Sequence, residues 1–159
     1  MKAVLLFVAG VAVGALLIRP GIAQDTRMRG LNHVGIVVED YDAALAFYTG
    51  AMGFREAYTI RRPDGSPQLT YLQLNRDTFV ELIPAAPGQT PGITHFGVEV
   101  GDLDAAVAQL RANGVTVPDP GLTPAKARYV RMRDLDGVDI EVMQFGPEAL
   151  QRKAMEAWR

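Results

Sequence analysis

The chain has 159 residues, of which 48% are hydrophobic and 21% are charged, a composition typical of an ordinary globular protein. Its net charge of −2, without any basic run, excludes the electrostatic footprint of a nucleic-acid-binding protein. The chain contains no cysteine, so disulfides are excluded, and a bound metal ion would depend on histidines and carboxylates. We therefore expect no nucleic-acid partner.

The first 23 residues differ in composition from the rest of the chain. Lys2 is followed by sixteen apolar residues, 3–18, and then by Arg19-Pro20. The small-residue pattern Gly21-Ile22-Ala23 resembles a signal-peptidase site. Because the apolar run is shorter than the roughly 20 residues that span a bilayer, residues 1–23 predict a cleaved export signal, with an uncleaved anchor as the alternative. The mature protein is then expected in the periplasm or secreted, without stable membrane association.

A first module is predicted over residues 31–83. Alternation in 31–38 indicates a strand with one buried face. Asp40 follows as a helix N-cap, ahead of an apolar stripe of helical spacing that ends near Gly50 and Gly53. The remaining strands of this module are expected at 54–61, 68–74 and 78–83, and residues 84–92 form a linker.

A second module is predicted over residues 93–145, with the same order of elements. A strand at 93–100 precedes the N-cap Asp102, and the helix stops at Asn113-Gly114. The remaining strands are expected at 115–117, 127–133 and 138–143. Residues 146–159 are expected to form a helical tail with an apolar face made of Leu150, Ala154 and Trp158.

The two modules match each other in sequence. With a shift of 62 positions, residues 31–50 and 93–112 share eight identities in twenty positions. His33 then coincides with His95, and a second match near the module ends places Glu81 on Glu141. We interpret the match as an internal duplication, in which each half begins with a strand that carries a histidine and ends with a strand that carries a glutamate.

The strand period of two residues places these four side chains on one face of the sheet. His33 and His95 alternate with apolar residues that must face the helices, and Glu81 and Glu141 alternate with apolar residues of the last strands. If the two βαβββ halves curve around a shared concave face, all four side chains meet there.

Two imidazoles and two carboxylates form a ligand set suited to one divalent metal ion, such as Ni, Zn, Co, Mn or Fe. A single histidine on a strand is more often structural, but this chain has only two, and both fall at matching positions. A bound ion could act as a Lewis acid and stabilise the enediolate that forms when a proton leaves a carbon beside a carbonyl. Glu81 and Glu141 are the candidate catalytic residues that would move this proton.

These residues resemble the vicinal oxygen chelate superfamily, which includes glyoxalases, bleomycin-resistance proteins and extradiol dioxygenases. The resemblance covers residues 31–145 and rests on short motifs in both modules. The motifs are Asn32-His33-Val34-Gly35-Ile36, Asp40 to Tyr48 followed by Gly53-Phe54, Val80-Glu81-Leu82, Thr94-His95-Phe96-Gly97-Val98, and Arg133-Asp134-Leu135-Asp136-Gly137 leading to Ile140-Glu141-Val142.

The resemblance implies an α+β fold, in which two tandem βαβββ modules form a cup-shaped mixed sheet with helices on the outside. It also implies that the two histidines and two glutamates occupy the family's four metal positions, as in glyoxalase I, and that the chain can form a homodimer. Together with the export signal, it predicts an exported metal-dependent isomerase or lyase that acts on a small α-oxo or α-hydroxy carbonyl compound. The positions at which glyoxalase I contacts glutathione are Val37 and Ala85 here, so the chain departs from the glyoxalase pattern at both, and the use of glutathione stays open. Methylmalonyl-CoA epimerases also resemble residues 32–48, but a CoA thioester is an awkward substrate for an exported protein.

Two other functions of the superfamily stay open at this point. An extradiol-type dioxygenase would use Fe(II) at His33, His95 and Glu141, and Glu81, as a fourth acidic ligand, argues against it. A non-catalytic binding protein of the bleomycin-resistance type would hold a small molecule in the cup. The expected substrate-binding residues are Tyr71, Gln73, Glu99, Tyr129 and Arg131.

Overall fold

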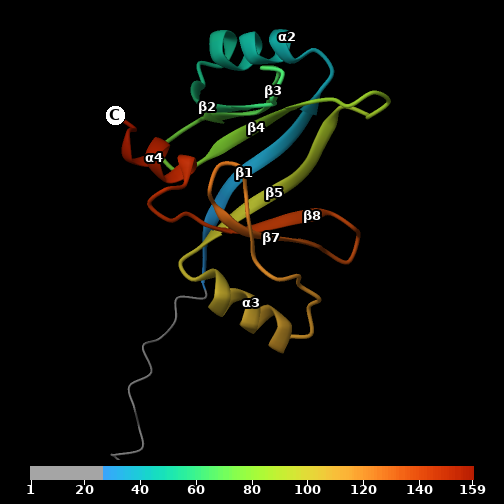
Figure 1. Ribbon diagram of the computed structural model, residues 1–159, viewed down its shortest axis with the longest axis vertical. Helices are drawn as coiled ribbons and strands as arrows, with labels where there is room; N and C mark the ends of the chain where they lie inside the picture. The colour runs from blue at the N-terminus through green and yellow to red at the C-terminus, as the bar shows by residue number, and fades with distance from the viewer. Residues whose placement is uncertain (1–26) are drawn as a thin grey trace, which may run out of the picture.

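The computed structural model describes residues 27–159, which form one curled sheet and its helices (Figure 1). The predicted export signal, residues 1–23, lies outside the described residues. Within residues 27–159, no helix is both long enough and apolar enough to cross a membrane.

The sheet contains eight strands from two βαβββ modules. The strands are β1 (Met28–Val38), β2 (Arg55–Arg61), β3 (Pro67–Gln73), β4 (Phe79–Pro84), β5 (Gly92–Val100), β6 (Gly121–Leu122), β7 (Arg128–Arg133) and β8 (Asp139–Gln144). Their order is β2-β3-β4-β1-β5-β8-β7-β6, with β1 and β5 antiparallel at the centre. β1 is parallel to β4, and β5 is parallel to β8. This arrangement confirms the predicted α+β cup.

An aspartate caps the helix of each module, as the sequence predicts. α2 (Tyr41–Ala46) follows Asp40, which accepts a hydrogen bond from the Ala43 N–H at 2.9 Å. α3 (Leu103–Ala112) follows Asp102, which accepts from the Ala105 N–H at 3.0 Å. Each cap satisfies a helix donor that has no partner within the helix. α2 continues into the π-helical turn η1 (Phe47–Ala51), and both helices lie outside the cup (Figure 1).

Apolar side chains on the outer face of the sheet pack against these two helices. Under α2, the buried residues Leu72, Val80 and Leu82 pack with residues of β1 and of the helix. Under α3, the corresponding group includes Val100 and Val142. Burying side chains of this size stabilises the fold by about 1.5–3 kcal/mol each. The inner face of the central strands is therefore free to carry polar groups.

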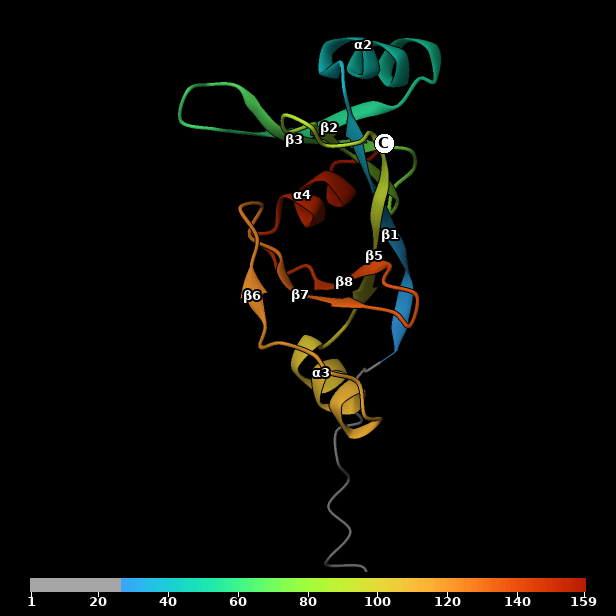
Figure 2. The same cartoon turned by 90° about the vertical axis from the view of Figure 1, so that its right-hand side faces the viewer.

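The last helix, α4 (Leu150–Glu156), lies inside the cup, between β2–β4 and β7–β8 (Figure 2). It buries Gln151 and Met155, and Met155 packs in a cluster with Tyr71 and Phe79. Of the predicted apolar face, Leu150, Ala154 and Trp158 are all half-buried, and Ala154 packs against the same cluster. Trp158 lies beyond the end of the helix. The concave sheet surrounds the helix, so a polar residue can face the interior.

The predicted strand at 115–117 is absent from the described structure, and the short strand β6 occurs a few residues later. The Arg111 guanidinium donates two hydrogen bonds to the Val117 carbonyl, at 3.1 and 2.9 Å, so this oxygen is occupied by a side chain. Pro118 then lacks the N–H that a ladder requires. β1 also begins earlier than predicted, at Met28, and β5 begins at Gly92.

Candidate metal centre

The four predicted ligands lie on the four central strands, in two rows that cross the sheet. In one row, Gly35 of β1 pairs with Glu81 of β4 on one side and with His95 of β5 on the other. In the second row, Gly97 of β5 pairs with His33 of β1 and with Glu141 of β8. Each row thus contains one histidine and one glutamate with a glycine between them.

The glycine in each row makes room for an imidazole ring. A methyl group at Gly35 would lie 2.0 Å from the His95 Cε1 atom, and one at Gly97 would lie 2.1 Å from the His33 Cε1 atom. Both distances are far below van der Waals contact, so only glycine fits beneath the rings. The two rings meet edge to face, with centroids 5.1 Å apart.

The ligand atoms have the separations that one metal ion requires. The His33 and His95 Nε2 atoms are 3.1 Å apart, and Glu81 Oε2 lies 3.0 Å from His95 Nε2 and 3.9 Å from His33 Nε2. Two atoms bound at about 2.1 Å to one ion lie about 3.0 Å apart at a right angle and about 3.4 Å apart in a tetrahedron. His33, Glu81 and His95 therefore form a group that could hold a metal ion.

Glu141 lies beside this group and is held by Arg131. Its Oε2 atom is 3.6 Å from His33 Nε2, although it falls outside the compact set formed by the other three residues. The Arg131 guanidinium donates two hydrogen bonds to Glu141 Oε1, at 3.1 and 2.6 Å. One carboxylate oxygen is thus bound to a cation from β7, and the other faces the histidines.

All four side chains are buried, and His33 is fully so. Burial lowers the pKa of His33 from 6.5 to about 4; nearby His95 and Arg131 act in the same direction, whereas Glu81 opposes them. A neutral imidazole at neutral pH leaves one ring nitrogen with a free lone pair, which is the form that binds a metal ion.

A cavity of about 500 Å³ opens onto this centre. Glu81, His95 and Glu141 line it, together with three of the predicted substrate-binding residues, Tyr71, Tyr129 and Arg131. Burial raises the pKa of Tyr71 well above its usual value, and the nearby Glu81 carboxylate contributes, so its phenol stays protonated. The cavity volume suits a small organic ligand.

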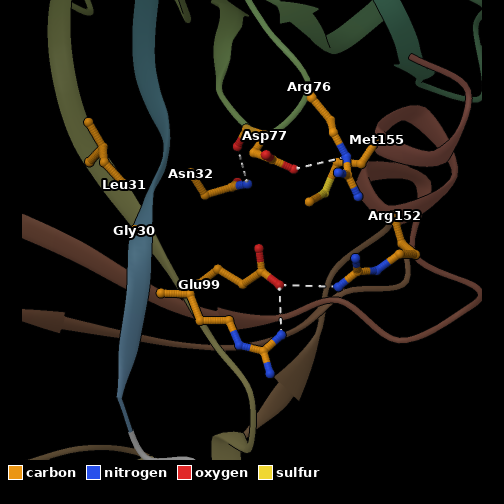
Figure 3. A pocket seen from close by; sticks show the side chains of 9 residues that line it. Gly30, Leu31, Asn32, Arg76, Asp77, Glu99, Arg152 and Met155 are labelled. Atoms are coloured by element: carbon orange, nitrogen blue, oxygen red, sulfur yellow. Dashed lines mark hydrogen bonds and ion pairs between the residues drawn. The ribbon is translucent and has the colours of Figure 1, made fainter. Parts of the chain in front are cut away.

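The other two predicted substrate-binding residues, Gln73 and Glu99, do not line this cavity. Gln73 accepts a hydrogen bond from Arg55 and donates to the Arg76 and Ala154 carbonyls. Glu99 lines a second cavity of about 280 Å³, where it forms ion pairs with Arg152 of α4 and with Arg29 (Figure 3). Each residue belongs to the inner face, as alternation predicts. Each lies near the end of its strand, too far from the histidines to reach the centre.

Sequence reasoning missed several residues that contribute to the site. Gln151 lines the large cavity from α4, and its Oε1 atom is buried without a hydrogen-bond partner among the described residues. Arg62 lines the same cavity from the turn between β2 and β3. Asn32 and Thr94 each precede a histidine and contact its ring. Asn32 and Thr94 could have been found from the sequence, because each stands one residue before a predicted histidine ligand.

Comparisons with known proteins identify the family of this chain. A sequence model of the Glyoxalase/Bleomycin resistance protein/Dioxygenase superfamily matches residues 30–142. The uncharacterized protein YaeR of Escherichia coli is 27% identical over 125 residues, which cover 74% of this chain and 97% of YaeR.

Two solved epimerases have a similar fold. The methylmalonyl-CoA epimerase of Mycobacterium tuberculosis is 26% identical, with a TM-score of 0.66 over 76% of this chain and 91% of the epimerase. A Streptomyces coelicolor methylmalonyl-CoA epimerase variant, solved with 2-nitronate-propionyl-CoA, is 23% identical, with a TM-score of 0.65 over 77% of this chain and 99% of its own. On the family match, the chain belongs to the Glyoxalase/Bleomycin resistance protein/Dioxygenase superfamily.

Proposed function

We propose that this protein is a metal-dependent isomerase or lyase of the glyoxalase type, which moves a proton beside the carbonyl group of a small α-oxo or α-hydroxy compound. The observation that carries the proposal is the convergence of two imidazoles and two carboxylates beside a cavity of about 500 Å³. When bound, a divalent ion would supply a Lewis acid that stabilises negative charge on the oxygens of the substrate.

The two carboxylates have different surroundings, which favour different roles. Glu141 Oε1 accepts two hydrogen bonds from Arg131, so the lone pairs of this oxygen are engaged and the carboxylate is fixed in place. Among the described residues, Glu81 accepts no hydrogen bond from a guanidinium, and its Oε2 atom lies 3.0 Å from His95 Nε2. Glu81 is therefore the candidate to take the proton from the substrate, and Glu141 the candidate to remain a fixed ligand.

The charge of the cavity favours an anionic substrate. Arg62 and Arg131 line it, against Glu81 and Glu141. With a divalent ion, these two arginines and two glutamates leave a net charge of +2, which attracts a carboxylate. Tyr71 and Tyr129 add apolar ring surface with a polar tip. A small α-hydroxy or α-oxo acid fits this combination.

We include export in the proposal, on the strength of the signal-like residues 1–23. The Streptomyces epimerase variant was solved with a CoA ester. A CoA ester is an awkward substrate for a protein that is exported from the cytoplasm, so we favour a substrate without CoA.

The test is exchange of the α-proton in D₂O. Zinc- or nickel-loaded protein is incubated with lactate, glycerate and methylglyoxal, and loss of the Cα–H signal is followed by proton NMR. We expect exchange with at least one compound, reduced on the order of 100-fold in Glu81→Gln because the proton acceptor is lost. Glu39→Gln, at an exposed glutamate away from the cavity, is the matched control.

Two outcomes would count against the proposal. Absence of exchange with every compound, in protein that holds its metal, would remove proton abstraction from these substrates. Oxygen uptake with catechol by iron-loaded protein would favour the dioxygenase alternative instead. Full exchange in Glu81→Gln would contradict the assigned proton acceptor alone.

A further inference from the structure

Each histidine of the metal centre has its second ring nitrogen in contact with the residue that precedes it. His33 Nδ1 lies 3.2 Å from Asn32 Oδ1, and His95 Nδ1 lies 3.0 Å from Thr94 Oγ1. Asn32 and Thr94 occupy matching positions one residue before the two histidines. A side-chain oxygen is thus placed behind each ring in the same way.

The network around Asn32 defines the direction of its hydrogen bond to the histidine. Asn32 is 1% exposed, and its Nδ2 atom donates to the Asp77 carbonyl at 3.3 Å, at the inner wall of the smaller cavity (Figure 3). A carbonyl can only accept, so the amide nitrogen must point towards Asp77 and Oδ1 must point towards the ring. His33 Nδ1 is therefore the donor in this pair.

The network around Thr94 gives the same answer by a different route. The Thr94 hydroxyl lies 3.3 Å from the Gly35 carbonyl, which can only accept, so this carbonyl is an acceptor for the single hydroxyl proton. With the proton there, the hydroxyl oxygen is left to accept from His95 Nδ1, at 3.0 Å. In this arrangement both imidazoles carry their proton on Nδ1, and both Nε2 lone pairs point into the centre, where the two Nε2 atoms lie 3.1 Å apart.

We infer that Asn32 and Thr94 are positioning residues, which hold both imidazoles in the Nδ1–H tautomer and thereby set the affinity of the centre for a divalent ion. The inference rests on the proposed metal site. Groups that orient a metal-bound histidine in this way typically change metal affinity 10–100-fold when they are lost. Neither residue reaches the ion, so the effect passes through the ring that each one holds.

The first part of the test determines the tautomers of His33 and His95 in the unsubstituted protein. The chain contains only two histidines, so a long-range ¹H–¹⁵N spectrum of labelled, metal-free protein at neutral pH shows two imidazoles. We expect a protonated Nδ1 and an unprotonated Nε2 in both rings. A protonated Nε2 in either ring of the wild-type protein would overturn the inference for that residue.

The second arm measures the zinc affinity of the full chain by competition with a chromophoric chelator. Thr94→Val, which removes the hydroxyl but keeps the shape, is expected to weaken zinc binding 10–100-fold and to allow the other His95 tautomer. Asn32→Ala should do the same for His33. Thr94→Ser keeps the acceptor and should stay within twofold of wild type. Thr49→Val is the matched control, since the Thr49 hydroxyl donates to the Leu45 carbonyl of α2, outside the cup.

The two proposals fail in distinguishable ways. Tight zinc binding by wild type and equally tight binding by Thr94→Val, with its tautomer unchanged, would overturn the positioning role and leave the metal site intact. A wild-type protein that binds no zinc would remove the metal site itself, whereas the spectrum of the metal-free protein would still decide the tautomers. If Asn32→Ala does not fold, Thr94→Val and the wild-type spectrum decide the question.

Discussion

Two glycines have as large a part in the centre as the ligands themselves. Gly35 and Gly97 stand between a histidine and a glutamate in their rows, and each supports the ring of the histidine in its own row. Any other residue would place a Cβ atom about 2 Å from a ring carbon of an imidazole. At the residue scale, the site therefore depends on the absence of a side chain at Gly35 and Gly97 as well as on the four side chains that converge there.

Substitution of either glycine by alanine tests this dependence. Gly35→Ala should displace His95, and Gly97→Ala should displace His33, because the new methyl group would lie about 2 Å from a ring carbon. We expect zinc affinity to fall more than tenfold in each variant, measured by chelator competition. Gly30→Ala, on the same strand as Gly35 and with nothing within 4 Å of the added atom, is the control and should bind zinc normally. Unchanged affinity in Gly35→Ala would show that the ring does not lie over this glycine.

The low pKa of His33, about 4 against the usual 6.5, predicts how the stability of the metal-free protein depends on pH. Below pH 6.5 the unfolded chain binds a proton at His33 that the folded protein does not bind. The free energy of unfolding should therefore be full above pH 6.5 and fall towards pH 4, with a loss on the order of 2 kcal/mol between pH 7.5 and 5.

Urea unfolding in the presence of a chelator measures this dependence. His33→Gln has no imidazole at this position, so its loss of stability between pH 7.5 and 5 should be smaller than that of wild type by about the same amount. Equal losses in the two proteins would contradict the buried, neutral state of His33.

At the scale of elements, α4 is the feature that distinguishes this cup most clearly from an open one. The helix lies beyond residues 30–142, to which the family match extends, and occupies the inside of the sheet (Figure 2). Gln151 faces the larger cavity and Arg152 pairs with Glu99 in the smaller one. The helix thus contributes Gln151 to the larger cavity, and Arg152 and Met155 to the smaller one.

Truncation of Met155 tests how firmly α4 is packed. Met155 is 5% exposed and belongs to the cluster around Tyr71 and Phe79, so Met155→Ala should lower the free energy of unfolding by about 2–4 kcal/mol in urea titrations. Glu156→Ala, at the exposed neighbouring position, should change it by less than about 0.5 kcal/mol. An unchanged free energy of unfolding in Met155→Ala would mean that α4 is not docked in the cup.

At the scale of the whole molecule, the sequence predicted which face each strand residue occupies but not that the structure carries two cavities with different linings. Alternation places Glu99 on the same face as His95, yet four residues correspond to roughly 13 Å along a strand. Glu99 therefore reaches the second cavity. Gln73 is displaced in the same way, at the far end of β3.

Features that depend on tertiary contacts also escaped prediction. Residues 115–117 have strand propensity, but the Arg111 side chain occupies the Val117 carbonyl. The buried face of α4 follows from a sheet that surrounds it, so its own apolar pattern is not decisive. By contrast, the caps Asp40 and Asp102 and the two modules could be predicted, because local hydrogen bonds and strand alternation determine them.

The central claim is that one divalent ion binds between His33, Glu81, His95 and Glu141. Its most direct test is the metal content of protein purified without a histidine tag, measured by elemental mass spectrometry after exposure to a mixture of divalent ions. We predict close to one ion per chain in wild type and almost none in His33→Ala, with Thr49→Val retaining the wild-type amount. No metal in the wild-type protein, or an equal amount in His33→Ala, would contradict the claim.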